Sequence, residues 1–346
     1  MTSVSVVIPC YKYGHFLEEA VSSVLDDQPG VDVRVLIIDD ASPDDSADVA
    51  NKIAANDPRV DVVVHATNKG HIATYNEGLL EWADGDYCVL MSADDRLTPG
   101  ALQRARDLLD AHPSVGFVYG YPLWFWQDKP PPTARTRLRG WSVWPGQWWL
   151  ERRLRQAENN ITSPEVVVRT SVQKRVGGYD PRLPHAGDLE MWMRLAANAD
   201  VGFLRGVDQA YYRVHGKNMR TSFQELLDLH QKRLAFDLVL DRYGASLSDP
   251  QYLSDVAHRR LSRQALWAAA RAYDQGRTDQ ASVDDLVAFA FDCWPEADRF
   301  PAYRTLQLRK RIGPRAMSYL QPFIVSAFVH KTYGWLQRRS WKYRGF

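Results

Sequence analysis

Short apolar runs alternate with amphipathic segments along the first third of the chain. The runs cover residues 4–8, 33–38, 60–64, 87–91 and 115–119, and they are rich in valine and isoleucine. Runs of this kind are typical of parallel strands that are buried on both faces. Apolar residues at helical spacing separate the runs, as in Phe16, Leu17 and Ala20. The alternation predicts an α/β fold: a doubly wound, Rossmann-like sheet with right-handed crossovers and helices on both faces.

Two dipeptides mark expected helix starts in this region. Ser42-Pro43 and Thr98-Pro99 each place a hydroxyl residue before a proline. A hydroxyl side chain is a good N-cap, and proline is tolerated at the first helical position because its missing N–H would be unpaired there. We therefore expect helices to begin at Pro43 and Pro99.

The pattern changes after residue 121 and again near residue 222. Six of the 12 tryptophans fall between residues 124 and 149, on both sides of a Pro130-Pro131-Pro132 break. From residue 222 onward the apolar residues recur at helical spacing, apart from a short irregular stretch at 244–249. We expect one domain over residues 1–221, with a nucleotide-binding half at 1–121 and an acceptor half at 122–221, and a helical C-terminal domain over residues 222–346.

Composition excludes some classes of function. The 43 basic and 42 acidic residues give a formal net charge of +1, so no global field attracts nucleic acid. Cys10, Cys88 and Cys293 are scattered, which favours reduced thiols. The sequence starts without the features of a signal peptide, and its longest apolar stretch, residues 322–329, is too short to span a bilayer. We expect a cytoplasmic protein, with peripheral attachment to the inner face of a membrane left open.

An acid pair follows the fourth apolar run. Asp94 and Asp95 come three residues after Met91, at the end of a predicted buried strand. Open α/β sheets bind ligands at the carboxyl ends of their strands, and paired carboxylates are hard ligands for Mg²⁺ or Mn²⁺. A metal–diphosphate site is one interpretation; favourable charge near a helix start is the other.

Other candidate residues follow the first three runs. Tyr11 can stack on a base, while Asp40 can accept from an imide N–H; a helix cap is the alternative for Asp40. Lys69, in Asn68-Lys69-Gly70-His71, begins a donor-rich segment that can approach a phosphate or sugar. An ordinary turn before a helix is equally compatible with that segment.

Further along, Asp188 precedes a helical stripe that includes Leu189 and Trp192. A carboxylate at a rigid helix end suits a general base, with His185 as local competitor and an N-cap as the plain alternative. Arg213 and His215 lie in an expected loop, where they suit a diphosphate or a metal.

These motifs together resemble those of family 2 glycosyltransferases. The matching segments are Val4 to Tyr11, Ile37 to Ser42, Asn68-Lys69-Gly70, Ser92 to Asp95, Gly177 to Asp180, Gly187 to Trp192 and Tyr212 to His215, in the family's order and spacing over roughly residues 3–220. The resemblance implies a GT-A fold, a nucleotide-sugar donor with UDP favoured, Mn²⁺ or Mg²⁺, and inversion at the anomeric carbon. It implies a hexosyltransferase that acts on a carbohydrate or lipid-linked acceptor.

The resemblance also assigns roles to individual positions. It implies nucleobase contacts from Pro9, Tyr11 and Asp40, a ribose contact from Asp94, metal binding by Asp95 with help from His215, and Asp188 as base. Lys69 joins the nucleotide site, and His185, Arg213 and Trp192 are candidates for the acceptor or diphosphate.

The chain departs from the family pattern in two places. Thr74-Tyr75-Asn76 stands where many relatives have Ala-Arg-Asn, so a phosphate-binding arginine is missing and Lys69, His71 or Arg213 is expected to compensate. Ser92 stands where the metal motif usually starts with an acid. No Gln-x-x-Arg-Trp signature of processive synthases follows Asp188, which favours transfer of a single sugar.

Two aromatic regions have a predicted role in binding the acceptor. Aromatic faces suit sugars, so the tryptophans of residues 124–149 are candidate acceptor contacts, with core packing as the alternative. The basic and aromatic residues of 331–346 suit an anionic membrane surface, and a subunit contact within a homo-oligomer or a solvated tail is an equal alternative. A retaining GT-A enzyme, a nucleotidyltransferase and a non-catalytic nucleotide-sugar-binding protein remain as rival functions.

Overall fold

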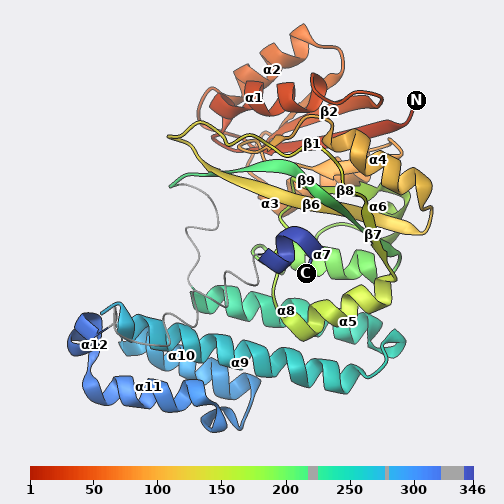
Figure 1. Ribbon diagram of the computed structural model, residues 1–346. Helices are drawn as coiled ribbons and strands as arrows, with labels where there is room; N and C mark the ends of the chain where they lie inside the picture. Colours follow the sequence, from red (N-terminus) through yellow and green to blue (C-terminus); the bar gives the residue numbers. More distant parts are fainter. Residues whose placement is uncertain (217–224, 277–279, 321–338) are drawn as a thin grey trace. The chain divides into compact units, whose positions relative to one another are not determined.

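The computed structural model describes residues 1–216, 225–276, 280–320 and 339–346 (Figure 1). The chain forms two compact units: unit 1 holds residues 1–150, 159–218 and 341–346, and unit 2 holds residues 151–158 and 219–340. The chain therefore passes between the units near residue 218, close to the expected boundary, and also at 150, 158 and 340.

Unit 1 is built on a nine-stranded mixed sheet with the order β3-β2-β1-β4-β8-β6-β9-β5, in which β7 also pairs with β9. The strands are β1 (Ser3–Cys10), β2 (Asp32–Asp39), β3 (Val60–Val64), β4 (Tyr87–Leu90), β5 (Arg96–Leu97), β6 (Val115–Trp126), β7 (Trp141–Trp144), β8 (Val166–Arg169) and β9 (Asp200–Val214). The first four are parallel to one another, and β8 is antiparallel to both of its neighbours. The five apolar runs are confirmed as strands.

Helices cover both faces of this sheet. Alternate residues of β1 point to opposite sides, so that Val6 and Ile8 join the core formed with α1 (Gly14–Leu25), α2 (Ser46–Asn56) and α4 (Ala101–Ala111). Val7 faces the other side, where a Cβ on Gly78 would meet its Cγ1 at 2.3 Å. That side carries α3 (His71–Asn76), η1 (Glu77–Trp82), α6 (Thr170–Val176) and α7 (Gly187–Ala196). The predicted GT-A-like fold, with helices on both faces, is confirmed.

The predicted helix starts are wrong by two or three residues. α2 begins at Ser46 and α4 at Ala101, and the N-cap position of α4 is Gly100 with φ of +70°. The two hydroxyls are used elsewhere, because Ser42 Oγ accepts from the Lys12 N–H at 3.0 Å and Thr98 Oγ1 donates to the Asp208 carbonyl at 2.6 Å. Both dipeptides therefore belong to turns that precede the helices.

Strands β5, β7, β8 and β9 have no counterpart in the predicted set. β9 runs for 15 residues and includes Tyr212, Arg213 and Val214, so the loop expected there is wrong up to residue 214. Its pairing of Tyr211 with Arg96 of β5 is antiparallel, and this pairing brings residues 213–215 beside the acid pair. A two-residue strand such as β5 and a strand with many polar and aromatic residues such as β9 give weak apolar signals, whereas the three valines of β8 are a strand signal that was overlooked.

Unit 2 is helical, as expected for the region after residue 222. Its helices are α8 (Glu225–Tyr243), α9 (Pro250–Asp274), α10 (Gln280–Cys293), α11 (Pro301–Ile312) and α12 (Pro314–Leu320), together with the end of α5 (Gly146–Gln156). Asp249 caps α9 by accepting from the Tyr252 N–H at 3.0 Å, with Pro250 at the first helical position. Within the described ranges, no helix is both long and apolar enough to cross a bilayer.

The last six residues belong to unit 1. The Trp341 ring stacks on Tyr119 with centroids 5.4 Å apart, the Tyr119 hydroxyl donates to the Gly345 carbonyl at 2.9 Å, and the Phe346 ring lies 4.7 Å from Trp144. Residues 331–338 of the expected basic and aromatic tail lie outside the described residues. Of its remaining aromatics, Trp341 and Phe346 are buried in unit 1, so they are not available to a membrane surface in this conformation.

Candidate active site

The acid pair lies in the turn between β4 and β5. Asp94 is held from two sides, because the Ser92 hydroxyl donates to its Oδ1 and His215 Nε2 lies 2.9 Å from its Oδ2. Asp95 Oδ1 accepts from the Arg213 backbone N–H at 2.9 Å. Both side chains are buried, and Ser92, the position where the family motif departs, fixes the first acid. Neither acid caps a helix, since α4 begins at Ala101.

Burial makes it unfavourable for both carboxylates of this pair to be ionised. It raises the pKa of Asp95 well above its usual value, and neighbouring Asp94 raises it further, while the Arg213 backbone bond lowers it only in part. A bound cation would relieve this cost, and carboxylates are the ligands that Mg²⁺ and Mn²⁺ prefer. Among the residues that the structure describes, no three His, Cys, Asp or Glu side chains gather as a metal site. His215 is paired with Asp94, so the two acids do not form a ready-made three-ligand site, and an ion held by them would take its other ligands from water or from the diphosphate.

Arg213 is engaged within the protein. Its Nε donates to the Asp94 carbonyl at 2.8 Å and its terminal nitrogen pairs with Glu19. The guanidinium also lies over the rings of Phe16 and Phe125, 4.5 Å and 4.7 Å from their centroids. Arg213 is buried and secures the acid turn in this state.

A second carboxylate, Asp40, follows β2. Its Oδ1 lies 2.7 Å from His65 Nδ1 and accepts from the Lys69 N–H at 2.8 Å, and its Oδ2 accepts from the Gly70 N–H at 2.9 Å. Burial raises the pKa of Asp40, but these bonds outweigh burial and the net shift is downward. The cap interpretation fails, because the N-cap of α2 is Asp45. Asp40 is an ionised acceptor at the carboxyl end of the sheet.

Tyr11 stands beside Asp40 because β1 and β2 end in register, with Cys10 opposite Asp39. Pro9 lies within β1, and the Tyr11 side chain is 43% exposed. Lys12 and Ala41, the residues that follow the two strand ends, both have positive φ, of 64° and 57°. Such strained turns are common at functional sites. They leave the Tyr11 ring accessible to a ligand.

Lys69 and His71 both have protein partners. Lys69 Nζ lies 2.8 Å from Glu77 Oε2, which also contacts His65 Nε2 at 3.1 Å. His71 Nε2 lies 3.0 Å from the Pro184 carbonyl, and burial lowers the pKa of His71. With Arg213 also engaged, none of the three residues expected to replace the missing arginine extends unpaired toward a phosphate.

Asp188 is the second residue of α7. The N-cap is Ala186, so the N-cap alternative for Asp188 is wrong. Burial raises the pKa of Asp188 to about 6, and a hydrogen bond from the Tyr179 hydroxyl lowers it in part. A carboxylate with a pKa near the working pH is suited to accept a proton.

Two other candidates occupy different surroundings. Trp192, on the same helix, is buried, stacks on Phe117 at 6.0 Å and donates to the Ile161 carbonyl at 3.4 Å. It is a core residue, which no acceptor reaches in this state. His185 lies near His71, whose pKa it lowers.

A partly buried tyrosine, Tyr75, interacts with all three of these acids. Burial raises the pKa of the Tyr75 phenol, and Asp188, Asp94 and Asp95 raise it further. One hydroxyl therefore lies within electrostatic reach of all three carboxylates. Tyr75 occupies the position of the missing arginine, so the chain places a neutral group there among the acids.

Sequence reasoning missed several residues of this site. Glu165 accepts from the Thr162 N–H at 2.6 Å, its pKa is raised to about 8 mainly by burial, and it interacts electrostatically with Asp188 and Asp95. His65 directly follows β3. The rule that ligand-binding residues follow strand ends, which selected Tyr11 and Asp40, therefore also points to His65. Glu165 precedes an unpredicted strand and carried no such signal.

The tryptophan-rich segment divides between core and surface. Trp149 is buried, whereas Trp126 and Trp148 are 54% and 44% exposed. Trp124 packs on Tyr212 of β9 with ring centroids 4.5 Å apart, and Tyr212 in turn raises the pKa of Tyr75. The Trp124–Tyr212 pair therefore borders the carboxylate cluster.

Comparison with known proteins gives a consistent result. Residues 5–174 match the model of glycosyl transferase family 2. The chain is 27% identical over 227 residues to an uncharacterized glycosyltransferase of Nostoc sp., covering 63% of this chain and 67% of that protein. An uncharacterized protein of Mycobacterium tuberculosis is 29% identical over 218 residues, covering 58% of this chain and 64% of that protein. The matched region is thus about two thirds of each relative.

Similarity extends to longer enzymes and to solved structures. Chondroitin synthase of Pasteurella multocida is 34% identical over 100 residues, which are 29% of this chain and 10% of the synthase. A crystal structure of S. aureus TarS in complex with UDP-GlcNAc superposes with a TM-score of 0.62 at 16% identity, covering 92% of this chain and 90% of that one. The structural likeness concerns the fold.

Proposed function

This chain belongs to glycosyl transferase family 2, and on that premise we propose that it transfers one sugar from a UDP-sugar to an acceptor hydroxyl with inversion at the anomeric carbon. The TarS complex contains UDP-GlcNAc, which makes that nucleotide sugar the first donor to test. A carbohydrate or lipid-linked acceptor is proposed, in keeping with the chondroitin synthase likeness.

One observation carries this proposal. The Tyr75 phenol interacts with Asp188 and with both acids of the pair, although these carboxylates come from different elements of the sheet domain. An inverting transferase needs a base on the acceptor side of the anomeric carbon and stabilisation of the leaving diphosphate on the other. Two acidic groups bordering one buried centre supply this division of roles.

The nucleotide end of the donor is assigned to the ends of β1 and β2. Tyr11 would stack on the base, since its ring is partly exposed, with the Lys12 ammonium 4.8 Å from its centroid. Asp40 accepts three hydrogen bonds, and an ionised carboxylate has about four acceptor sites, which leaves one for the imide N–H of uracil. Asp94 is proposed to accept from the ribose.

Asp188 is proposed as the base of a direct displacement. Its carboxylate takes the proton of the acceptor hydroxyl while that oxygen forms a bond to the anomeric carbon. The bond from this carbon to the diphosphate breaks, and UDP leaves with the electron pair. Because the pKa of Asp188 is about 6, most of the carboxylate is ionised at neutral pH.

Asp95 and Asp94, with His215 beside them, would hold Mn²⁺ or Mg²⁺. When bound, such an ion neutralises charge on the diphosphate oxygens and so makes UDP a better leaving group. The raised pKa of Asp95 fits this role, since binding a cation favours the ionised acid.

The test is a donor screen with identification of the product. The protein is incubated with UDP-GlcNAc and other UDP-sugars in the presence of Mn²⁺ and candidate glycan acceptors, and UDP release and product are measured. A β-linked product from the α-linked donor supports the proposal. An α-linked product indicates a retaining enzyme, and donor binding without turnover across acceptors indicates a binding protein; either result contradicts it.

A further inference from the structure

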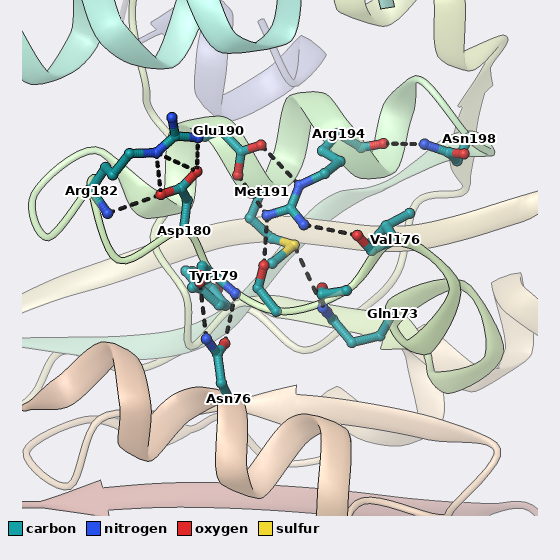
Figure 2. A network of polar contacts seen from close by, with 12 residues as sticks. Asn76, Gln173, Val176, Tyr179, Asp180, Arg182, Glu190, Met191, Arg194 and Asn198 are labelled. Atoms are coloured by element: carbon teal, nitrogen blue, oxygen red, sulfur yellow. Dashed lines mark hydrogen bonds and ion pairs between the residues drawn. The ribbon is translucent and has the colours of Figure 1, made fainter. Parts of the chain in front are cut away.

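The segment between α6 and α7 is clamped against α3 by one side chain. Asn76 Oδ1 accepts from the Tyr179 N–H at 2.6 Å, and Asn76 Nδ2 donates to the Tyr179 carbonyl at 2.9 Å (Figure 2). A Cβ on Gly178 would lie only 2.3 Å from Asn76 Oδ1, so the close approach requires glycine there. The backbone of Tyr179 is thus fixed at both of its polar groups.

A second clamp comes from α7. Arg194 donates to the carbonyls of Val176 and Gly178 at 2.9 Å and 2.8 Å, and Glu190 holds the same guanidinium at 2.8 Å and 2.7 Å (Figure 2). Arg194 and Glu190 are both buried, so these charged hydrogen bonds are shielded from water. The helix that carries Asp188 therefore also anchors the segment that carries Tyr179.

The ring of Tyr179 has equally close contacts. It meets the Tyr75 ring edge to face, with centroids 5.5 Å apart and planes at 76°. A Cβ on Gly187, the residue before Asp188, would lie 3.2 Å from Tyr179 Cδ1. The ring thus packs directly on the start of α7, and its hydroxyl hydrogen-bonds the Asp188 carboxylate.

We propose that Tyr179 is the positioning residue of the general base: its phenol O–H donates to Asp188 and holds that carboxylate in one orientation. The clamps from Asn76 and Arg194 make this possible, because a hydrogen bond directs its partner only when the donor itself is fixed. The role as base rests on the function proposed above, whereas the effect of the hydroxyl on Asp188 can be measured without any substrate.

The groups that face Asp188 determine the direction in which its pKa should change when the Tyr179 hydroxyl is removed. Burial raises its pKa to about 6, and the Tyr179 hydroxyl opposes that rise. Tyr75 of α3 and Glu165, which precedes β8, interact with the same carboxylate; with raised pKa values, both remain neutral near pH 7. Removing the Tyr179 hydroxyl leaves burial unopposed, so the pKa of Asp188 should increase.

The direct test is a titration of Asp188 by NMR. The full chain is labelled with aspartate carrying ¹³C at the side-chain carboxyl, and the Asp188 signal is identified by its loss in Asp188→Asn. In Tyr179→Phe, the titration midpoint of Asp188 is expected to move up by about one pH unit, a tenfold change in proton affinity. An unchanged midpoint would overturn the proposal.

Tyr87→Phe is the matched control. The Tyr87 hydroxyl also donates to an aspartate, Asp110, and Tyr87 is also buried, in a region of the sheet with none of the site residues. It should leave the Asp188 midpoint unchanged, and an equal shift in this control would overturn the assignment to Tyr179. If Tyr179→Phe does not fold, Asn76→Ala, which releases the Tyr179 backbone, should give a smaller upward shift; no shift there would also count against the proposal.

Turnover measurements distinguish a failure of the role given to Tyr179 from a failure of the proposed function. With an active donor and acceptor, the acidic limb of kcat/KM should move to higher pH in Tyr179→Phe, and its rate deficit should shrink above that limb. A merely structural role would lower the rate equally at every pH and would overturn the inference. Wild-type turnover in Asp188→Asn would instead refute the proposed function, whatever the titration of Tyr179→Phe shows.

Discussion

The backbone N–H of Arg213 donates to Asp95 Oδ1 at 2.9 Å, which joins residues 118 positions apart in the chain. This bond lies next to a short antiparallel pairing in which Arg96 of β5 faces Tyr211 of β9. Through it, the end of β9 places Arg213 and His215 around the acid pair. The geometry of the proposed metal site therefore depends on a strand that lies far from it in sequence.

The first prediction concerns the proposed base. Asp188→Asn should lower kcat by roughly 10²–10⁴-fold, the usual contribution of a general base, while the thermal shift caused by the donor persists. Coupled UDP-release assays and donor melting curves would check this. Loss of donor-induced stabilisation together with activity would point to a binding role for Asp188 instead.

The same variant should be more stable at neutral pH. The folded pKa of Asp188, about 6, lies above its ordinary value of 3.8, so its ionisation opposes folding: the penalty is absent below pH 3.8 and reaches its full size above pH 6. At pH 8 Asp188→Asn should therefore melt a few degrees above wild type, and at pH 4 the difference should vanish. Melting curves at the two pH values would check this prediction. A melting temperature of Asp188→Asn below that of wild type at pH 8 would contradict the burial argument.

A second prediction addresses the metal. UDP with Mn²⁺ should raise the melting temperature of wild type above the value with UDP alone, because ligands of the native state stabilise it. In Asp95→Ala this Mn²⁺-dependent increment should disappear, while Asp285→Ala, which removes an exposed acid, should retain it. An increment of wild-type size in Asp95→Ala would exclude Asp95 as a ligand.

A third prediction concerns the clamp. Gly178→Ala introduces a methyl group 2.3 Å from Asn76 Oδ1 and should destabilise the protein by about 1–3 kcal/mol, the usual cost of overpacking. Chemical denaturation would measure the change. Gly244→Ala is the control, because its Cβ would meet the nearest atom at 3.5 Å, an ordinary contact. Equal stability of the two variants would show that the Asn76 side chain moves away from the added methyl group at little cost in free energy.

A fourth prediction concerns the last residues. Phe346→Ala removes a buried ring from the cluster with Trp144, Trp148 and Trp149, and it should cost about 2 kcal/mol, less than a fully enclosed phenylalanine. Tyr343→Ala, at a position that is 53% exposed, should cost little. Tryptophan fluorescence during chemical denaturation would measure the two changes in stability. A larger loss from Tyr343→Ala would show that the packing described here is incorrect.

Sequence patterns predicted the part of the fold that local chemistry controls. The apolar runs identified β1 to β4 and the start of β6, and the rule that ligands bind at strand ends selected Tyr11, Asp40, Asp94 and Asp95. β5 was missed because it has only two residues, and β9 because its end is aromatic and charged, whereas β8 (Val166–Arg169) has three consecutive valines, a strand signal that was overlooked. The burial of Arg213 and Trp192 could not be predicted for a related reason: burial and partners arise from tertiary packing, which no local pattern encodes.

Unit 1 includes residues 341–346, which the ribosome adds after the whole of unit 2. During synthesis the aromatic surface of Tyr119 and Trp144 is therefore exposed until the final segment emerges, even though most of unit 1 has long been translated. Contacts of such large sequence separation form late and slowly. A nascent chain halted before Trp341 would leave these rings uncovered, and such an intermediate is a natural substrate for a chaperone.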